Sequence, residues 1–424
     1  MNKRLAIDFG TSNSAVAVLN GDQVKPLMMD QGADTIPTAI FFDFEEKEIL
    51  FGAEATRYLI EGASGRYMRS LKSVLGSSLM KERRLIMGRY FDFYDIISIF
   101  LSALKARAEA LEGRKFESVL SGRPVHFHDD AIRDKQALLD LKECYVRAGF
   151  RHVDFMFEPE AAAVASTAFG QKDSSANALG LIVDIGGGTS DYTLFQRAKN
   201  TNPQHNQLDI LASHGIRLGG THFDKQLSLR HFMPFLGKDS TLRRPMAEGT
   251  LEAPIGLFSD LATWETIPLL YTPQTLYEIK DYEHLAINPT LFRRLRNLIE
   301  NRRGHELAFT AERAKIAAND AKDISTIVNL DLIEANLSCA ISGNDLIDLM
   351  KNAQQKITQA ALETLKKGNS APESVTDVIF VGGSSLMGFV RTSMQQIFPT
   401  ANFHTSAVFT AVVDGLARAT ASNK

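Results

Sequence analysis

Two stretches of this sequence combine aspartate, glycine and hydroxyl side chains in an order that suits phosphate binding. In one of them the apolar run 181–183 precedes Asp184, three glycines, Thr189 and Asp191. Successive glycines let backbone N–H groups approach an anion closely. A carboxylate at a strand end can hold Mg²⁺ through water, because Mg²⁺ gives up its water reluctantly. The pattern therefore suits a nucleotide phosphate with Mg²⁺, and an ordinary hairpin turn is the alternative.

The second stretch repeats this pattern near the start of the chain. Asp8 follows an apolar run and precedes Gly10, a run of small polar residues and a further apolar run, 15–19. Two related turns indicate two similar halves that face each other. A third glycine turn, Gly382–Ser385, follows the apolar run 375–381 and precedes a helix, whose N-terminus can bind a phosphate or a ribose. An ordinary strand-to-helix turn is its alternative.

These motifs resemble those of the Hsp70 family and, more broadly, of the actin, Hsp70 and sugar-kinase ATPases. They occur in the family's order and span nearly the whole chain. The segments that carry the resemblance are 7–14, 158–163, 183–191, 218–224, 312–315, 380–385 and 411–417.

The resemblance implies an α/β protein with the actin-like ATPase fold, in which two pseudo-symmetric, ribonuclease-H-like lobes surround a nucleotide cleft. Lobe I is expected over residues 1–169 with an inserted subdomain at about 25–113. Lobe II is expected over 170–424 with an inserted subdomain at about 220–324. No C-terminal peptide-binding domain is expected, which is similar to the short Hsp70-like proteins that stop at the nucleotide-binding domain.

The resemblance also implies ATP or ADP with Mg²⁺ as ligands and assigns roles to particular residues. The expected catalytic residues are Lys72, Glu158, Asp184, Thr189 and Asp191. Asp8 and Asp184 are expected to hold the metal through water. The expected nucleotide-binding residues are Gly10, Thr11, Ser12, Asn13, Gly186, Gly187, Gly188, Thr189, Gly219, Gly220, Glu312, Lys315, Asn319, Gly382, Gly383, Ser384 and Leu386.

Lys72 owes its expected role to the segment 72–76, which is similar to the family's lysine segment. An ammonium beside the terminal phosphate would neutralise charge that develops in the transition state. Arg66 and Arg69 lie nearby in the sequence, so a solvated basic surface is the alternative interpretation.

Two positions depart from the family's pattern at the adenine. Leu386 and Ile316 stand where the family has arginines. An arginine stacks on a ring and adds a cation–π contact, which leucine and isoleucine cannot supply. The sequence therefore predicts weaker ATP binding and looser selectivity for adenine, unless the stretch 236–275, which departs from ordinary Hsp70 chaperones, folds over the base.

One cluster could be mistaken for a metal site. His126, His128, Asp129 and Asp130 are close in sequence, but zinc needs further ligands that have no obvious position. The prediction favoured here is that Asp129 or Asp130 caps the helix that extends to about Ala148.

Composition limits the classes of function. The net charge is −3, with 44% hydrophobic and 23% charged residues. This balance favours neither nucleic acid nor an anionic membrane as partner. Two cysteines without metal-type spacing predict a reducing compartment. No signal peptide or membrane span is expected, so a cytoplasmic monomer is the simplest interpretation.

The function predicted is binding of MgATP and slow hydrolysis by a chaperone-like regulatory ATPase that acts through protein partners. The sequence does not identify a client or a partner. The alternatives are a non-hydrolysing, nucleotide-dependent scaffold or filament former, and a small-molecule kinase of the same superfamily. The segments 312–315 and 158–159 favour the Hsp70 branch over a sugar kinase.

Overall fold

The computed structural model describes residues 4–30, 32–165, 179–197, 208–245, 248–321, 324–405 and 410–421. Its contacts divide the chain into two units. The first unit comprises residues 1–219, 354–386 and 390–424, and the second comprises 220–353 and 387–389. The lobe boundaries expected from the sequence stay a prediction.

The first unit contains a six-stranded sheet built around the first aspartate–glycine motif. Its strands are β11 (His152–Phe157), β10 (Ser118–Arg123), β1 (Arg4–Phe9), β2 (Asn13–Asn20), β3 (Gln23–Leu27) and, paired with β2, β4 (Thr35–Pro37). β1, β10 and β11 are parallel, and β2 and β3 are antiparallel. The apolar runs on either side of Gly10 predict a hairpin there, and the antiparallel pairing of β1 with β2 confirms it.

A five-stranded sheet built around the second motif belongs to the same unit. Its order is β14 (Leu208–Ile216), β13 (Ser190–Arg197), β12 (Leu179–Ile185), β19 (Val375–Val381) and β20 (Asn402–Thr405). β12, β13 and β14 are antiparallel, whereas β12, β19 and β20 are parallel. Both sheets therefore join an antiparallel meander to two parallel strands, as expected of two similar halves.

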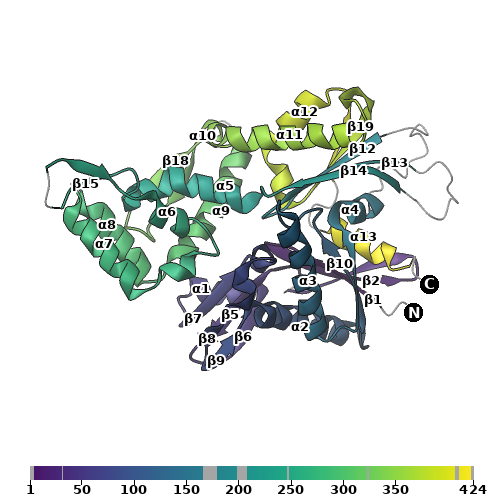
Figure 1. Ribbon diagram of the computed structural model, residues 1–424, viewed down its shortest axis with the longest axis horizontal. Coiled ribbons are helices and arrows are strands. Elements are labelled where there is room, and N and C mark those ends of the chain that lie inside the picture. Colours follow the sequence, from purple (N-terminus) through teal and green to yellow (C-terminus); the bar gives the residue numbers. More distant parts are fainter. Residues whose placement is uncertain are drawn as a thin grey trace. The chain divides into compact units, whose positions relative to one another are not determined.

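Two helices rich in small residues lie between these sheets (Figure 1). α4 (Glu158–Ala165) and α13 (Ala411–Ala419) share one buried core with side chains from both sheets. Gly415 of α13 allows the two helices to approach closely, because a β-carbon there would lie 2.9 Å from Ala161 Cα and would collide with its carbonyl group. This packing holds the two sheets in one unit.

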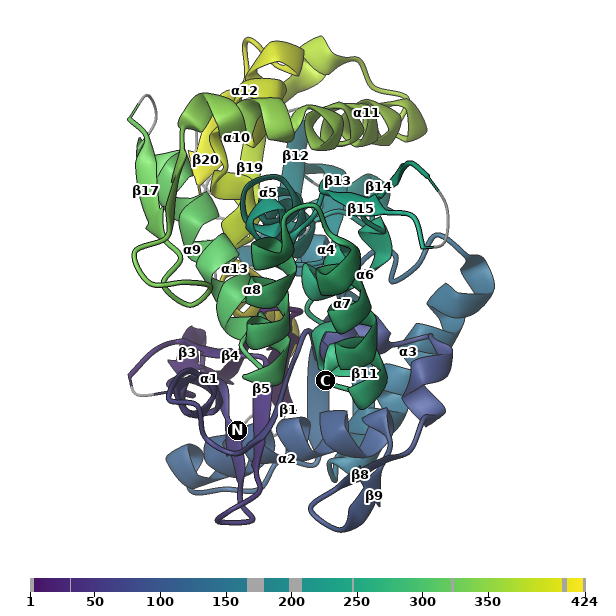
Figure 2. The same cartoon turned by 90° about the vertical axis from the view of Figure 1, so that its left-hand side faces the viewer.

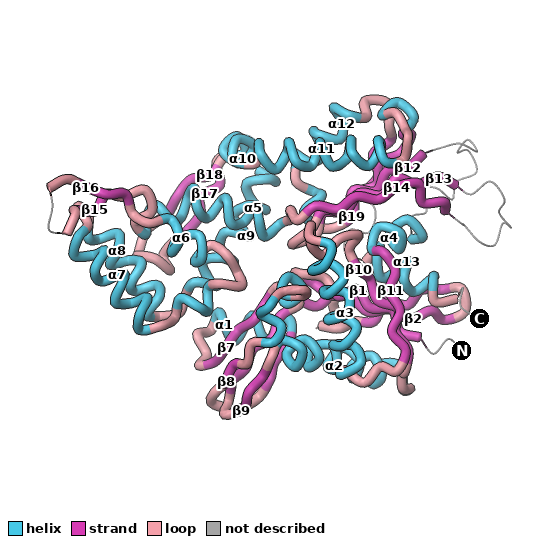
Figure 3. Tube along the Cα trace, viewed as in Figure 1, coloured by secondary structure: helices cyan, strands magenta, loops and turns pink. Residues whose placement is uncertain are grey.

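The remaining elements of the first unit surround the two sheets (Figure 3). A three-stranded sheet and a short hairpin follow β4, and longer helices cover the core. These elements are β5 (Ala39–Asp43), β6 (Ile49–Phe51), β7 (Gly65–Arg69), β8 (Arg84–Ile86), β9 (Arg89–Phe91), α1 (Gly52–Ile60), α2 (Phe93–Glu112), α3 (Ala131–Arg147) and the larger parts of α11 (Lys351–Lys367) and α12 (Gly388–Ile397).

Local signals explain where the helices of this unit begin and end. Asp92 and Asp95 form a capping box at the start of α2, and Gly113 ends it in the left-handed conformation. Asp130 caps α3 by accepting from the N–H of Arg133, as predicted. The apolar spacing over residues 346–365 predicts a single helix there, and this prediction is wrong. α10 (Gly343–Leu349), in the second unit, and α11 are separate helices with Met350 between them.

The second unit is mostly helical (Figure 2). Its elements are α5 (Gly220–Leu227), β15 (Thr241–Arg243), β16 (Thr250–Glu252), α6 (Ile255–Leu261), α7 (Pro273–Leu285), α8 (Pro289–Glu300), α9 (Gly304–Ala321), β17 (Thr326–Asn329), β18 (Ser338–Ile341) and α10. α7 and α8 run side by side. Trp264 is buried against Phe309 and stacks on His305. Over the described residues, no helix combines the length and the apolar character needed to cross a bilayer.

Candidate functional site

The turns of the two related hairpins pack against each other. The β1–β2 turn contains Thr11 and Ser12, and the β12–β13 turn contains Gly187 and Gly188. A β-carbon at Gly187 would collide with the side chain of Ser12, and one at Gly188 would lie 3.2 Å from Thr11 Oγ1. Only glycine permits so close an approach. The two backbone loops that the sequence assigns to phosphate binding are therefore adjacent.

Two further glycine turns join them. A β-carbon at Gly219, which follows β14, would lie 2.7 Å from the carbonyl oxygen of Gly186. Gly382, at the end of β19, has a positive φ of 77°, and a β-carbon there would lie 2.7 Å from Asp184 Oδ1. Four glycine-containing turns of the first unit thus surround the end of β12. Gly383, Ser384 and Leu386 continue from Gly382 in a short 3₁₀ turn.

Carboxylates cluster beside these turns. Asp8 lies near the end of β1, and Asp184 lies near the end of β12 opposite Asp191 on β13. Glu158 begins α4 directly after β11. Gly122 of β10 leaves room for two of them, because a β-carbon there would lie 3.1 Å from Glu158 Cγ and 3.5 Å from Asp8 Oδ1. The parallel arrangement of β1, β10 and β11 brings these residues to one edge of the sheet.

Lys72 is the cation of this cluster. It lies in a 3₁₀ turn, Leu71–Val74, and its Nζ is 2.5 Å from Glu158 Oε1. Only 8% of the residue is exposed. Burial lowers the pKa of Lys72, but the negative charges of Glu158 and Asp8 outweigh burial, so the pKa lies above its usual value. The solvated basic surface considered as an alternative therefore does not apply to Lys72.

The acidic groups of the cluster outnumber Lys72, and this surplus of buried negative charge is reflected in raised pKa values. Burial and the charge of Glu158 raise the pKa of Asp8 to about 7, against the opposing effect of Lys72. Burial and Glu158 also raise the pKa of Asp191 to about 7, although the N–H of Val125 donates to it over 2.8 Å. Burial and the neighbouring carboxylates raise the pKa of Asp184 well above its usual value.

This donor set fits a hydrated magnesium ion. Carboxylate oxygens are the ligands that Mg²⁺ accepts, and a cation would offset the surplus of buried negative charge. Among the residues that the structure describes, no group of three or more His, Cys, Asp or Glu side chains is arranged to hold a metal directly. The zinc alternative around His126 and His128 finds no support in the described residues.

The residues expected at the nucleoside form contacts within the second unit. Lys315 Nζ on α9 is 2.8 Å from Asp224 Oδ1 and 3.5 Å from the carbonyl oxygen of Gly220, which begins α5. Asn319 Oδ1, on the same helix, accepts from the N–H of Gly388 over 2.7 Å. Glu312 lies on α9 as well. Lys315 of α9 thus contacts the start of α5 within the second unit.

The two positions that depart from the family's pattern present exposed apolar side chains within their own units. Leu386 is 49% exposed and Ile316 is 51% exposed. Both are accessible to a ligand or to solvent, and neither can supply the charge of an arginine.

A comparison with protein families identifies the class of this fold and site. The model of the family described as Hsp70 protein matches residues 4–244 and 296–417. The chain therefore belongs to the Hsp70 family. Its fold is the actin-like ATPase fold of that family, and it contains a nucleotide-binding domain of the ATPase type. The match is interrupted over residues 245–295, which overlap the stretch 236–275 that was expected to depart from the family.

Four polar residues, to which the sequence assigned no role at a nucleotide site, contact the Lys72 turn, Lys315 or one another. They are His128, Asp140, Arg217 and Asp224. Asp140 bonds to the backbone 64 residues away, and Arg217 bonds to a side chain 89 residues away. No spacing rule reports contacts of this range. Asp224 had a weak signal, because it belongs to the segment 218–224 that carries the resemblance.

Proposed function

We propose that this protein is a magnesium-dependent ATPase whose chemistry takes place beside Lys72. One observation supports the proposal most: a buried lysine and four carboxylates lie beside a set of packed glycine turns. Phosphoryl transfer requires mainly positioning and electrostatic stabilisation, and this cluster supplies both. The surplus of acidic groups favours a site completed by a cation over a purely structural ion pair.

Each residue of the cluster has a specific role in this proposal. Backbone N–H groups at 10–13 and 186–189 bind the phosphates of the nucleotide. Lys72 stabilises the negative charge that develops on the transferred group. Glu158 and Asp191, with the hydroxyl of Thr189, orient the attacking water. Bound Mg²⁺, held through water by Asp8 and Asp184, neutralises phosphate charge.

The residues of the second unit bind the nucleoside in this proposal. Lys315, Glu312 and Asn319 on α9, with Gly220, contact the sugar and the base. In the first unit, Gly382, Gly383, Ser384 and Leu386 are proposed as nucleotide-binding residues. Hydrolysis is slow and serves a chaperone-like regulatory role through protein partners. We further propose that the protein acts as a cytoplasmic monomer.

The test compares Lys72→Met with Lys81→Met in assays of phosphate release and of nucleotide binding by calorimetry. Lys81 is an exposed lysine in the next 3₁₀ turn, Ser78–Lys81, so its variant is the matched control. Loss of Lys72 is expected to lower kcat by about 10²–10³-fold. The Kd for MgATP is expected to change by no more than about threefold, and Lys81→Met is expected to resemble the wild type.

A second variant separates chemistry from folding. Lys72→Met leaves Glu158 buried without its partner, which is strongly destabilising. The double variant Lys72→Met/Glu158→Gln removes both charges and is expected to keep the fold. Because Glu158 also has a proposed role in the chemistry, Glu158→Gln alone is the reference, and the double variant is expected to have the lower kcat of the two. Binding of MgATP without hydrolysis by the wild type would instead support a nucleotide-dependent scaffold. Normal turnover by a folded Lys72 variant would remove this lysine from the mechanism.

A further inference from the structure

The peptide group that joins Leu75 to Gly76 is held at both of its polar ends by side chains. His128 Nε2 lies 2.5 Å from the carbonyl oxygen of Leu75, and the N–H of Gly76 donates to Asp140 Oδ2 over 2.9 Å. The N–H of Leu75 also bonds to the carbonyl oxygen of Lys72, at 3.4 Å. This peptide group therefore ends the turn that carries Lys72.

The glycine in this peptide group makes the arrangement possible. Gly76 has a φ of 72°, in the left-handed region. A β-carbon there would lie 3.0 Å from His128 Cδ2 and would collide with the carbonyl oxygen of Arg133. The carbonyl oxygen of Gly76 also accepts from Arg133 Nε, at 3.4 Å. The turn thus fits closely against the start of α3.

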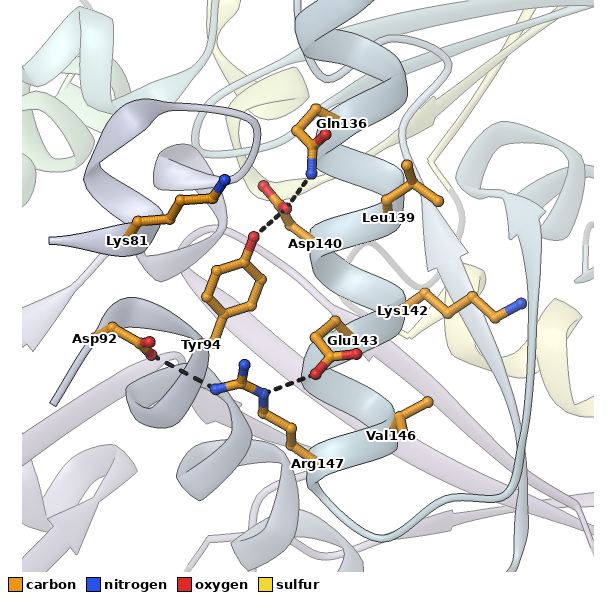
Figure 4. Close-up of a pocket in the computed structure, with 10 residues that line it drawn as sticks. All are labelled: Lys81, Asp92, Tyr94, Gln136, Leu139, Asp140, Lys142, Glu143, Val146 and Arg147. Carbon is orange, nitrogen blue, oxygen red and sulfur yellow. Dashed lines mark hydrogen bonds and ion pairs between the residues drawn. The ribbon is translucent and has the colours of Figure 1, made fainter.

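Asp140 is held in place from its other side. Its Oδ1 accepts from the hydroxyl of Tyr94 over 2.5 Å and from Gln136 Nε2 over 2.7 Å, as Figure 4 shows. Asp140 is only 2% exposed. Both carboxylate oxygens are therefore committed, one to the helix side chains and the other to Gly76. A carboxylate bonded in this way cannot move without the loss of several hydrogen bonds.

The second nitrogen of His128 connects to another part of the site. Nδ1 lies 2.8 Å from Arg217 Nη1. A guanidinium can only donate, so Nδ1 accepts, and Nε2 carries the hydrogen that it donates to Leu75. Arg217 precedes Leu218 and Gly219, and the carbonyl oxygen of Leu218 accepts from Ser190 Oγ over 2.6 Å. A neutral imidazole therefore bridges the Lys72 turn and the Gly219 turn.

We propose that His128 and Asp140 are positioning residues for Lys72, and that His128 also couples the lysine turn to the Gly219 turn. This inference rests on the proposed function of Lys72. Neither residue touches the carboxylate cluster in the hydrogen bonds described above, so both act through the backbone of the turn. Displacement of a catalytic group by about 1 Å can lower a rate by 10²-fold, which is why these hydrogen bonds affect turnover.

The bridge requires a neutral imidazole, and this gives it a pH dependence. The charged groups that face the ring are Arg217, Arg133 and Asp134. Burial lowers the pKa of His128, and the two arginines lower it further. His128 is therefore neutral in the folded protein near pH 7. The bridge is complete at pH 7.5. Its contribution to stability declines as the pH falls below about 6.5, where an unfolded histidine gains its proton, and the bridge itself is lost only at the still lower pKa of the folded His128.

The experiment compares His128→Leu, which removes both hydrogen bonds, with His128→Gln, whose amide can donate and accept but does not titrate. His152→Leu is the matched control, because His152 is exposed on β11. We expect His128→Leu to lower kcat by about tenfold or more, while the KM for ATP changes by no more than about threefold. His128→Gln is expected to recover most of kcat. It is also expected to lack the part of the decline in kcat below pH 6.5 that comes from protonation of His128, while the part that comes from protonation of Asp8 and Asp191 remains.

Two measurements on the nucleotide-free protein do not depend on hydrolysis. Hydrogen exchange of His128→Leu is expected to accelerate at 73–76 and 217–219 and to stay unchanged in β1 and β12. In the wild type, ¹⁵N NMR of the ring is expected to show hydrogen on Nε2 and a pKa below 6.5. Removal of the cation in Arg217→Met is expected to raise that pKa.

These readouts distinguish the ways in which the inference can fail. Unchanged exchange in both turns, or kcat of His128→Leu equal to that of the wild type, would overturn it. Exchange that accelerates throughout the first unit, with no recovery in His128→Gln, would show a merely structural role and would also overturn it. If the wild type does not hydrolyse ATP, the proposed function fails, whereas the exchange and NMR results still decide whether His128 joins the two turns.

Discussion

The sheet that contains β1 and the sheet that contains β12 have the same strand pattern but carry different side chains at the same place. In the first sheet Asp8 pairs with Ala15 across the hairpin, whereas in the second Asp184 pairs with Asp191. Lys72 and Glu158 both come from the part of the chain that precedes the second sheet. The similar strand pattern provides two turns that can face one ligand, and the differing residues provide the charges.

The two turns also differ in the space that they leave. The β1–β2 turn has side chains at Thr11 and Ser12, whereas the β12–β13 turn has glycine at 187 and 188. Those glycines receive the side chains of the first turn. Two turns that both carried side chains at these positions could not pack as closely, since both would project β-carbons into one space. Glycine at 187 and 188 is thus a requirement of the packing against Thr11 and Ser12.

The largest expected effect concerns the helices that hold the two sheets together. Gly415→Ala would push a β-carbon into the carbonyl group of Ala161. We expect the free energy of unfolding to fall by about 2–3 kcal/mol, the typical cost of overpacking. Gly256→Ala in α6 is the control, because no atom lies within 4 Å of its β-carbon position. It is expected to stabilise by up to about 1 kcal/mol. Urea denaturation measures the free energy of unfolding of both variants. Equal changes in Gly415→Ala and Gly256→Ala would contradict the close contact between α4 and α13.

The next effect tests the acidic surplus in the two halves. Asp8→Asn and Asp184→Asn each remove one buried or partly buried negative charge. We expect each variant to raise the melting temperature of the nucleotide-free protein. MgATP at 1,000 times its Kd adds about 4 kcal/mol to the free energy of unfolding of the wild type. We expect the same MgATP concentration to add only about half as much to each variant.

Differential scanning fluorimetry at pH 8, with and without MgATP, measures both changes. The proposal would be wrong about the metal if both variants gained as much stability from MgATP as the wild type. A lower melting temperature without nucleotide would show that the carboxylates stabilise the fold instead of serving a ligand.

A smaller effect distinguishes neighbouring glycines of the second turn. Gly187→Ala forces Ser12 to move, whereas a β-carbon at Gly186 would meet only the carbonyl oxygen of Thr189 at 3.8 Å. We expect Gly187→Ala to weaken MgATP binding by about tenfold, or about 1.4 kcal/mol. Gly186→Ala is expected to stay within about twofold of the wild type. Titration calorimetry decides, and an equal loss in both variants would mean that the contact between the turns is unimportant.

The smallest effect concerns the base. Leu386→Arg adds a guanidinium at an exposed position, and a well-placed cation–π contact contributes about 0.5–1 kcal/mol at such sites. We expect ATP to bind up to about fivefold more tightly, and GTP to gain less. Parallel titrations of ATP and GTP on both proteins provide the measurement. Tight, adenine-selective binding by the wild type, with no gain in the variant, would show a differently built base pocket.

Much of the fold was predictable because its signals are local. Periodicity and capping rules predict the two strands near whose ends Asp8 and Asp184 lie. They also predict the helix that stops before Gly113 and the cap at Asp130. The prediction of a single helix over residues 346–365 was wrong because it used the same local signal. The apolar stripe continues past Met350, so periodicity does not reveal the break between α10 and α11. The resemblance assigned both Lys72 and Glu158 to the catalytic site, but neither it nor the spacing predicted their ion pair, since 86 residues separate the two.

The sequence by itself determined the strands, the glycine turns and the identity of the charged side chains, because these depend on neighbours within a few residues. Only the tertiary structure decided that Gly187 receives Ser12, that Lys72 pairs with Glu158, and that His128 bridges two turns. These contacts join residues far apart in the chain. They depend on how whole sheets and helices pack, and side-chain types alone do not specify that packing.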